Sequence, residues 1–302
     1  MNGMPWLGVL VPGSVEQVQT YTRSDCAEFH RNYYTHSNTC VVLVGDVEHD
    51  RDVAKVENLL SGAPIGRLEL PTLEKQKFQS GHFRKQSDFQ ENEGCARVTV
   101  CWPGVNYADP KRSYATRIAM RALADIVVPQ LITAHGLYNA QLYRNGSLDF
   151  TPVNLLKLEG GDKNTVLHAL QRGLGLITDP ETAAALSTGH EQAIQREEIS
   201  TRVNQLTIQH LATQLNDMHM IGAPLDLFGR YEVAHIQKVT PEDVWDVVMH
   251  LAEDPIFLGI RGHEDALGII PSVDEVGAWR ARPSIAPRGF GQVARGIRNV
   301  AG

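Results

Sequence analysis

Hydrophobic and polar residues follow two different periods along the chain, and each change of period predicts a change between helix and strand. In residues 1–62, two stretches with apolar residues at helical spacing flank an apolar run, Cys40–Val44. A short apolar run rich in β-branched residues is typical of a strand that is covered on both faces. Gly45-Asp46 predicts a tight turn after this strand, with Asp46 as the cap of the following helix. The apolar positions of the two helices are Cys26, Phe29 and Tyr33, then Val53, Val56 and Leu60.

A second group of elements begins near residue 82 and contains most of the predicted strands. Strands are expected at 83–90, 96–102, 138–144, 148–158 and 256–260. In the second of these, Ala96, Val98, Val100 and Trp102 share one face. Asn145-Gly146 predicts a hairpin turn between the third and fourth strands. Strands followed by long helical stretches predict an α+β fold, with a mixed or antiparallel sheet packed against helices.

Helical patterns fill most of the remaining sequence. A long helix is predicted to begin at Asp109-Pro110 and to kink or end near Val128, because Pro129 lacks the N–H that a helix interior uses. Further on, one apolar stripe runs from Ile199 to Met218 at helical spacing. Val239–Val244 combines a capping threonine, a proline and two acidic residues, which together predict the start of another helix.

Changes in composition divide the chain into four parts. Residues 1–62 are interpreted as the C-terminal part of a first domain, and residues 63–81, polar and flanked by proline and glycine, as a linker. Residues 82–265 carry a complete set of strands and helices and are interpreted as a second domain. Residues 266–302, rich in proline, arginine and glycine, are expected to be a surface tail.

Composition and charge exclude several classes of partner. The chain of 302 residues is 42% hydrophobic and 21% charged, with a net charge of −7, so no basic surface favours nucleic acid. Uninterrupted apolar runs fall short of the roughly twenty residues that span a bilayer, so no membrane span is expected. The four cysteines form neither a CxxC pair nor a zinc-knuckle spacing, and buried, reduced thiols are favoured over a disulfide framework, which suggests the cytoplasm or the mitochondrial matrix.

Several of these segments, taken in order, resemble one protein family. F-H-R-N-Y-Y at Phe29–Tyr34, a polar turn and V-V-L-V-G-D-V at Val41–Val47 are similar to a segment of the pitrilysin/insulinase-type zinc metallopeptidases, the inverzincins. The strand, Pro103-Gly104 and long helix resemble the opening of the second domain in that family, and V-T-P-E-D-V at Val239–Val244 resembles a motif near its end. The resemblance implies paired α+β domains. It also implies that Met4 to about Gly262 corresponds to the part that follows the catalytic half-domain.

The zinc motif of the family is not found in the sequence. Inverzincins bind zinc through H-x-x-E-H on a helix, where the glutamate acts as general base on the zinc-bound water. None of the twelve histidines fits this pattern, since His190-Glu191 and His263-Glu264 have no second histidine one turn away. The third zinc ligand of the family is a glutamate on another helix. By the resemblance, this ligand and the H-x-x-E-H motif lie upstream of Gly3. No catalytic residue and no cofactor are therefore assigned to this chain, and zinc is expected only in a partner half.

The resemblance also implies a set of substrate contacts. Active members carry L-R-E-x-x-G-L-x-Y, and the corresponding stretch here is Leu131–Asn139. Its last four residues, Gly136, Leu137, Tyr138 and Asn139, are the candidate substrate-binding residues. Isoleucine stands at the arginine position, as Ile132, and cannot donate hydrogen bonds to a peptide. The alternative interpretation is that this hairpin only packs against the core.

These observations favour a non-catalytic, peptide-holding portion of a zinc metalloendopeptidase. The resemblance includes two-chain enzymes with one inactive subunit, such as the mitochondrial processing peptidase, and respiratory core subunits built on the same scheme. The expected partner is a zinc-bearing half or another subunit of a homo- or hetero-oligomer, and the expected ligands are extended peptides. Two alternatives stay open. One is a structural scaffold with the same fold and no bound peptide, and the other is a self-sufficient α/β enzyme built on the turn after Val44.

Overall fold

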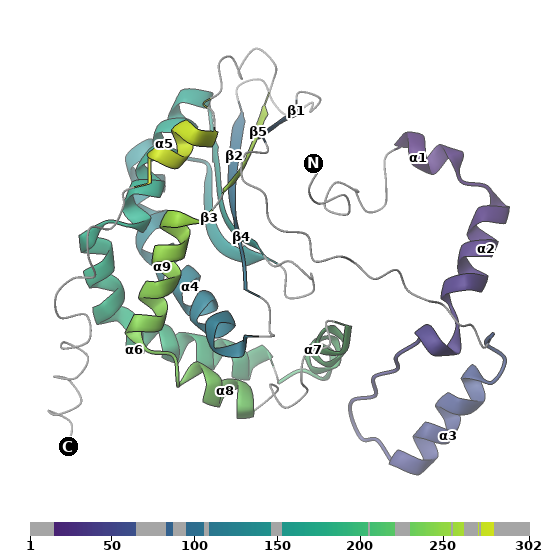
Figure 1. The fold of residues 1–302 in the computed structure, drawn as a ribbon. Coiled ribbons are helices and arrows are strands. Elements are labelled where there is room, and N and C mark those ends of the chain that lie inside the picture. The colour runs from purple at the N-terminus through teal and green to yellow at the C-terminus, as the bar shows by residue number, and fades with distance from the viewer. Residues whose placement is uncertain are drawn as a thin grey trace, which may run out of the picture. The chain divides into compact units, whose positions relative to one another are not determined.

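The fold divides into two compact units in a computed structural model of the chain (Figure 1). The structure describes residues 15–64, 83–86, 95–105, 109–145, 153–204, 206–220, 230–254, 256–262, 271 and 273–280. Almost all of the predicted linker, residues 63–81, lies outside these ranges. The predicted boundaries at residues 62 and 81 stay a prediction.

The first unit is helical over its described residues. Its elements are α1 (Val15–Thr20), α2 (Arg23–Tyr33), the 3₁₀ helix η1 (His36–Asn38), α3 (His49–Leu60) and α7 (Ile208–Met220). The start of α2 follows from its sequence. The Thr22 side chain accepts a hydrogen bond from the backbone N–H of Asp25, and the Asp25 carboxylate accepts one from the backbone N–H of Thr22. This reciprocal capping box satisfies two N–H groups that a helix end leaves open.

The predicted strand Cys40–Val44 is not formed in the described part of the chain. Residues 39–44 have no strand partner there, and the side chains of Val41 and Leu43 are each 45% exposed. A strand is defined by its partner, so an apolar run without one stays outside any sheet. The predicted cap is also wrong: α3 begins after Glu48, whose N–H donates to the Asp52 carboxylate at 3.0 Å.

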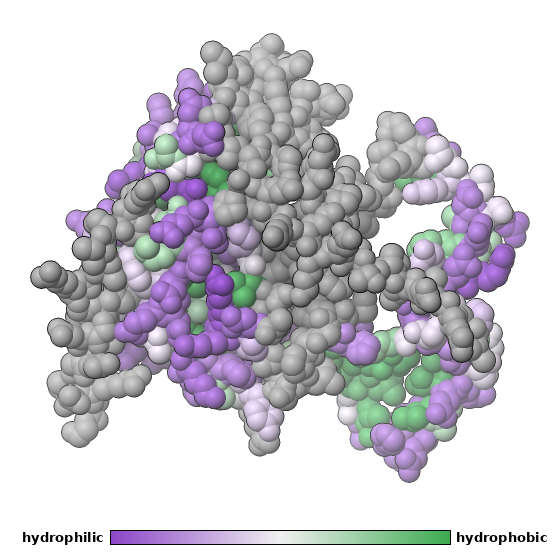
Figure 2. All heavy atoms as spheres, in the orientation of Figure 1, coloured by the Kyte–Doolittle hydropathy of each residue, from purple (hydrophilic) through white to green (hydrophobic). Residues whose placement is uncertain are grey.

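Apolar side chains of the first unit are largely open to solvent. Neither α2 nor α3 has a buried residue, although both carry the predicted apolar positions. The exposed large hydrophobic residues include Val15, Tyr21, Phe29, Tyr34 and Leu59. Figure 2 shows hydrophobic surface on these helices. Residues that would form a core in a complete domain are thus left uncovered by the described part of this chain.

The second unit contains a five-stranded sheet with the order β1-β5-β2-β4-β3. Its strands are β1 (Phe83–Gln86), β2 (Ala96–Pro103), β3 (Asn139–Asn145), β4 (Val153–Gly160) and β5 (Phe257–Gly262). β1 runs parallel to β5, and all other neighbours are antiparallel. The predicted α+β class with a mixed sheet against helices is confirmed.

The central strand β2 buries one complete face, as its alternating pattern predicts. Ala96, Val98, Val100 and Trp102 are at most 2% exposed, while the residues between them are half-buried. The indole N–H of Trp102 donates to the carbonyl of Leu251 at 2.8 Å, so this large side chain enters the core without an unpaired polar group.

Helices of the second unit supply the other half of its core. They are α4 (Pro110–His135), α5 (Lys163–Ile177), α6 (Pro180–Asn204), α8 (Arg230–Ile236), α9 (Pro241–Glu253) and α11 (Val273–Ala278). In this unit α4 contacts β3, α5, α8 and α9 (Figure 1). The predicted start of α9 is confirmed, because Thr240 and Asp243 form a second capping box and Pro241 is the first helical residue.

Two sequence predictions for α4 and the following hairpin are wrong in detail. The sequence predicts a kink or an end near Val128; α4 does not end there but runs through Pro129 to His135, and the kink stays a prediction. Val127 and Leu131, on either side of the proline, are fully buried, so packing outweighs the lost backbone hydrogen bond. Asn145 pairs with Val153, which excludes a two-residue turn at Asn145-Gly146; Gly146 itself lies outside the described residues.

Two predictions for the C-terminal half also change. The apolar stripe from Ile199 to Met218 is not one helix, since α6 ends at Asn204 and α7 belongs to the first unit. The predicted tail contains α11, where Val276 is fully buried in the core. The Arg280 guanidinium donates to the carbonyls of Leu251 and Asp254, at 3.3 and 2.5 Å, and ties α11 to the end of α9.

Among the described helices, α4 alone is long and apolar enough to cross a membrane when judged by length and composition. Core helices of water-soluble proteins meet the same two criteria. The apolar residues of α4 include Ile118, Leu123, Val127 and Leu131, which are buried in the two core clusters of this unit.

All four cysteines are free thiols, but they are not equally buried. Cys26 and Cys40, in the first unit, are exposed, contrary to the prediction of buried thiols. Cys95 and Cys101 are both half-buried. Cys101 lies within β2, where burial raises the pKa of its thiol to about 12.

We predict that iodoacetamide labels Cys26 and Cys40 of the folded chain at about pH 8.5, while Cys101 stays unmodified. The thiolate is the reactive form, and burial disfavours it at Cys101. Peptide mass spectrometry reads the result, and labelling in denaturant gives the complete reaction as control. The raised pKa also means that the free energy of unfolding falls as pH rises from about 8.5 towards the folded value. Equal labelling rates for Cys101 and Cys26 would contradict this account.

Candidate functional site

The four predicted substrate-binding residues lie between α4 and β3, with different environments. Gly136 ends α4 at φ +60°, a left-handed conformation that favours glycine. Leu137 is buried in the core. Tyr138 is 71% exposed, and its backbone N–H donates to the carbonyl of Glu159 at 2.9 Å. Asn139 begins β3 and is half-buried. Gly136 and Leu137 therefore shape the turn, and only Tyr138 and Asn139 offer side chains to a ligand.

Tyr138 lies against the turn that leads from β4 into α5. A Cβ atom at Gly161 would lie 2.8 Å from the Tyr138 hydroxyl, closer than real side chains come. The absence of a side chain at Gly161 therefore makes room for the phenol. Because Tyr138 is exposed, its ring can move aside, so this contact positions the ring without holding the fold together.

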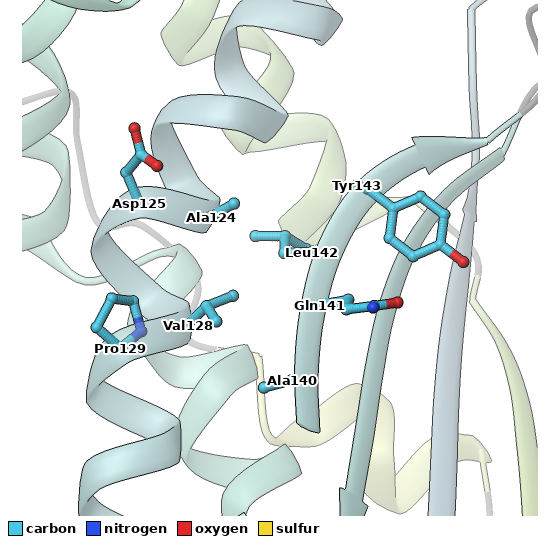
Figure 3. Close-up of a pocket in the computed structure, with 8 residues that line it drawn as sticks. All are labelled: Ala124, Asp125, Val128, Pro129, Ala140, Gln141, Leu142 and Tyr143. Carbon is cyan, nitrogen blue, oxygen red and sulfur yellow. The ribbon is translucent and has the colours of Figure 1, made fainter. Parts of the chain in front are cut away.

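An open pocket with a volume of about 590 Å³ lies beside the same hairpin (Figure 3). One side is formed by α4 and the other by β3. The residues that line it are Ala124, Asp125, Val128 and Pro129 of α4, and Ala140, Gln141, Leu142 and Tyr143 of β3. We call this pocket the β3 groove.

The β3 groove follows the outer edge of the sheet. Its β3 residues are consecutive, so they point alternately to the two faces of the strand. In Figure 3, Leu142 projects towards α4, whereas Gln141 and Tyr143 lie on the other side of the strand. A pocket that touches both faces of one strand lies at its edge, and β4 occupies the other edge of β3. Among the described residues no strand pairs with this outer edge.

The α4 side of the groove is apolar with a polar rim. Pro129 has no N–H to donate to the carbonyl of Asp125, one turn earlier, so that carbonyl lacks its usual helical partner. The Asp125 carboxylate is paired with the guanidinium of Arg196 from α6, and both side chains are exposed. The groove thus combines apolar walls with backbone polar groups and carries little net charge.

Polar residues also lie beside the groove, on the face of the sheet where the side chains of β2 are half-buried. Arg97, Glu159 and Asn139 are aligned across β2, β4 and β3. The Glu159 carboxylate forms ion pairs with Arg97 at 2.5 Å and with Lys157 at 3.0 Å. Burial raises the pKa of the Glu159 carboxyl, but the hydrogen bond from Lys157 and the charge of Arg97 outweigh it and hold the pKa below its usual range. Glu159 therefore stays ionised beside Asn139.

No group of three or more His, Cys, Asp or Glu side chains within the described ranges is arranged to hold a metal ion. His190 is buried at 8% exposure, and burial lowers the pKa of its imidazole. His263 lies outside the described residues.

Sequence reasoning proposed residues that lie next to the β3 groove, and their role stays a prediction; it missed the groove itself. Gly136–Asn139 was identified through the resemblance, whereas the residues of α4 that line the groove carry no motif. One signal was available. Pro129 lies inside a helix that packing keeps intact, and because proline has no N–H, one backbone carbonyl of the preceding turn lacks its helical hydrogen bond. The other determinant, the edge position of β3, comes from the strand order.

Comparison with known proteins finds similarity to the same family. Residues 20–151 match the model of the peptidase M16 inactive domain. A protein of Rickettsia bellii named as an uncharacterized zinc protease is 21% identical over 256 residues, which cover 81% of this chain and 55% of that relative. The chain therefore spans little more than half the length of this curated relative.

Two solved structures show the same fold. A chain in complex III2 from Candida albicans aligns with a TM-score of 0.68 and 15% identity, covering 91% of this chain and 66% of that one. The peptidase M16 inactive domain from Pseudomonas fluorescens aligns with a TM-score of 0.64 and 14% identity, covering 83% of this chain and 60% of that one. The resemblance predicted from the sequence is confirmed over residues 20–151, which are similar to the inactive domain of the pitrilysin/insulinase-type (M16) metallopeptidases.

Proposed function

We propose that the chain holds extended peptides in the β3 groove and does so as the non-catalytic portion of a zinc peptidase whose metal lies in a partner half. The observation that carries the peptide-holding role is the open edge of β3. An edge strand presents alternate N–H and C=O groups outward, and an extended peptide can add to it as a further strand. Apolar walls beside such an edge can receive alternate side chains of the peptide.

The composition of the groove favours a peptide with small or medium apolar side chains. Ala124, Val128 and Leu142 offer apolar contact, while the Asp125 carboxylate is already paired with Arg196. The Asp125 carbonyl offers one further acceptor. Tyr138 and Asn139, at the start of β3, are proposed to contact the same peptide.

The partner half is supported by the first unit. Its apolar residues are exposed, and residues 39–44 have the composition of a buried strand without a partner in the described part of the chain. A second polypeptide segment that supplies a neighbouring strand would cover both. In the M16 family such a segment is expected to carry the zinc site.

We predict that the purified chain binds no stoichiometric zinc and does not cleave an unstructured fluorogenic peptide. Metal analysis and a cleavage assay with and without a chelator measure both. Co-expression with an H-x-x-E-H-bearing protein of the same source is expected to give chelator-sensitive cleavage that neither chain shows alone. Stoichiometric zinc together with cleavage by this chain alone would overturn the proposal.

We predict that the chain alone binds the capped peptide Lys-Val-Thr-Val-Thr-Val-Lys by strand addition. Isothermal titration at about 0.15 M salt limits non-specific attraction to the acidic chain. Two N-methylated versions are compared, one modified at every valine and one at every threonine. Only one alternating set of N–H groups faces β3, so one version should lose at least about tenfold in affinity and the other should bind nearly as the parent does.

A pair of alanine variants tests the place of binding. Ala124→Glu puts a charge into the groove and should weaken binding of the parent peptide by at least about tenfold. Ala184→Glu, at an exposed position of α6, makes the same change elsewhere and should leave affinity within about twofold. Thermal unfolding confirms that both variants are folded. Equal effects of the two N-methylated peptides would exclude strand addition, and no binding by any version would favour the scaffold alternative.

A further inference from the structure

A buried group of charges joins three helices of the second unit. Arg117 of α4 contacts Glu197 of α6 through Nη2, and its Nη1 donates to Glu232 of α8 at 2.7 Å. Arg121 adds an ion pair to Glu197 at 3.3 Å. Glu197 and Glu232 are each only 5% exposed. The planar guanidinium thus bridges two carboxylates from different helices, a geometry that lysine could not reproduce.

Aromatic contacts extend this group along α8. The Arg117 guanidinium lies 5.4 Å from the centre of the Tyr114 ring, within the range of a cation–π contact. The Tyr114 ring stacks on that of His235 with centroids 5.8 Å apart. α4 therefore holds α8 through Arg117 and Tyr114 as well as through the buried Ile236.

The position of these helices in the chain gives the charges a specific role. The chain leaves the second unit at the end of α6, forms α7 in the first unit, and re-enters the second unit before α8. Glu197 lies on the helix of departure and Glu232 on the helix of return. Both carboxylates meet at one guanidinium on α4, so the helix before α7 and the helix after it are linked at one point.

The buried charges affect the stability of α8 mainly when one of them is removed. A buried ion group is often no more stabilising than apolar residues of the same volume, but removal of one member leaves an uncompensated charge. α8 has seven residues, too few for a stable helix without tertiary contacts. If Arg117 is lost, the hydrogen bond that Glu232 accepts from it at 2.7 Å is lost as well. Water replaces this bond most easily when α8 detaches, because this opens one short helix and leaves the sheet paired.

We propose that Arg117, Glu197 and Glu232 form a charge clamp between α6 and α8. These are the helices of the second unit that come directly before and after α7 in the chain. Loss of the clamp releases α8 as a local unit and leaves the sheet intact. The clamp is independent of the peptide-holding role and of any zinc-bearing partner, so its test stands apart from that of the proposed function.

Hydrogen exchange of the whole chain, read by mass spectrometry, tests the clamp with matched variants. Arg117→Met should accelerate exchange in α8 by about a hundredfold or more and leave β2 and β4 unchanged. Arg196→Met is the control, because Arg196 pairs with Asp125 across the same two helices, α6 and α4, but at an exposed position. It should change exchange in α8 by less than about twofold.

Glu232→Gln provides a second variant that preserves side-chain shape and decides the matter if Arg117→Met does not fold. Removal of this one charge should accelerate exchange in α8 by about tenfold, with β2 and β4 again unchanged. Unchanged exchange of α8 in the folded variants would overturn the proposal. Equal acceleration in α8 and the sheet would also overturn it, since the charges would then support the whole unit.

Discussion

The pairing of β2 with a strand on each side is the interaction on which the second unit depends. β4 and β5 satisfy its backbone groups, and one face of the strand is buried under α4, α5 and α9. Trp102 joins this face to α9 through its hydrogen bond to Leu251. Because β2 is central and the sheet is open, some other strand must end the sheet, and β3 does so. The groove beside β3 is therefore a consequence of the strand order.

The first unit shows the opposite situation with residues of similar character. Phe29, Tyr33, Val41 and Leu43 have the apolar composition of a core, yet all are at least 36% exposed. Local signals still act there, since the Thr22 capping box starts α2 as it would in any helix. Helix formation needs only nearby residues, whereas a buried strand needs a partner from elsewhere. This difference explains why the helices form and Cys40–Val44 does not pair within the described part of the chain.

The sequence predicts those features that depend on neighbouring residues. The alternation in β2 and the cap at Thr240 both follow from short stretches. Features that depend on distant residues are missed. Pro129 stays within a helix because Val127 and Leu131 are held by the core. The partners of Arg117 lie 80 and 115 residues away, and no local pattern connects them. The candidate site divides in the same way, into a turn that the resemblance locates and a groove that only the assembled sheet creates.

The most direct test of the central claim is hydrogen exchange at Cys40–Val44 in the monomeric chain, compared with β2 in the same sample. The claim is that the first unit is an incomplete domain that needs a strand from outside the described chain. It predicts that amides of Cys40–Val44 exchange at nearly the rate of an unstructured peptide, while amides of β2 exchange at least about a thousandfold more slowly. Protection of Cys40–Val44 equal to that of β2, in a chain shown to be monomeric by sedimentation, would contradict the account. The segment would then be paired within this chain, and the first unit would need no partner half.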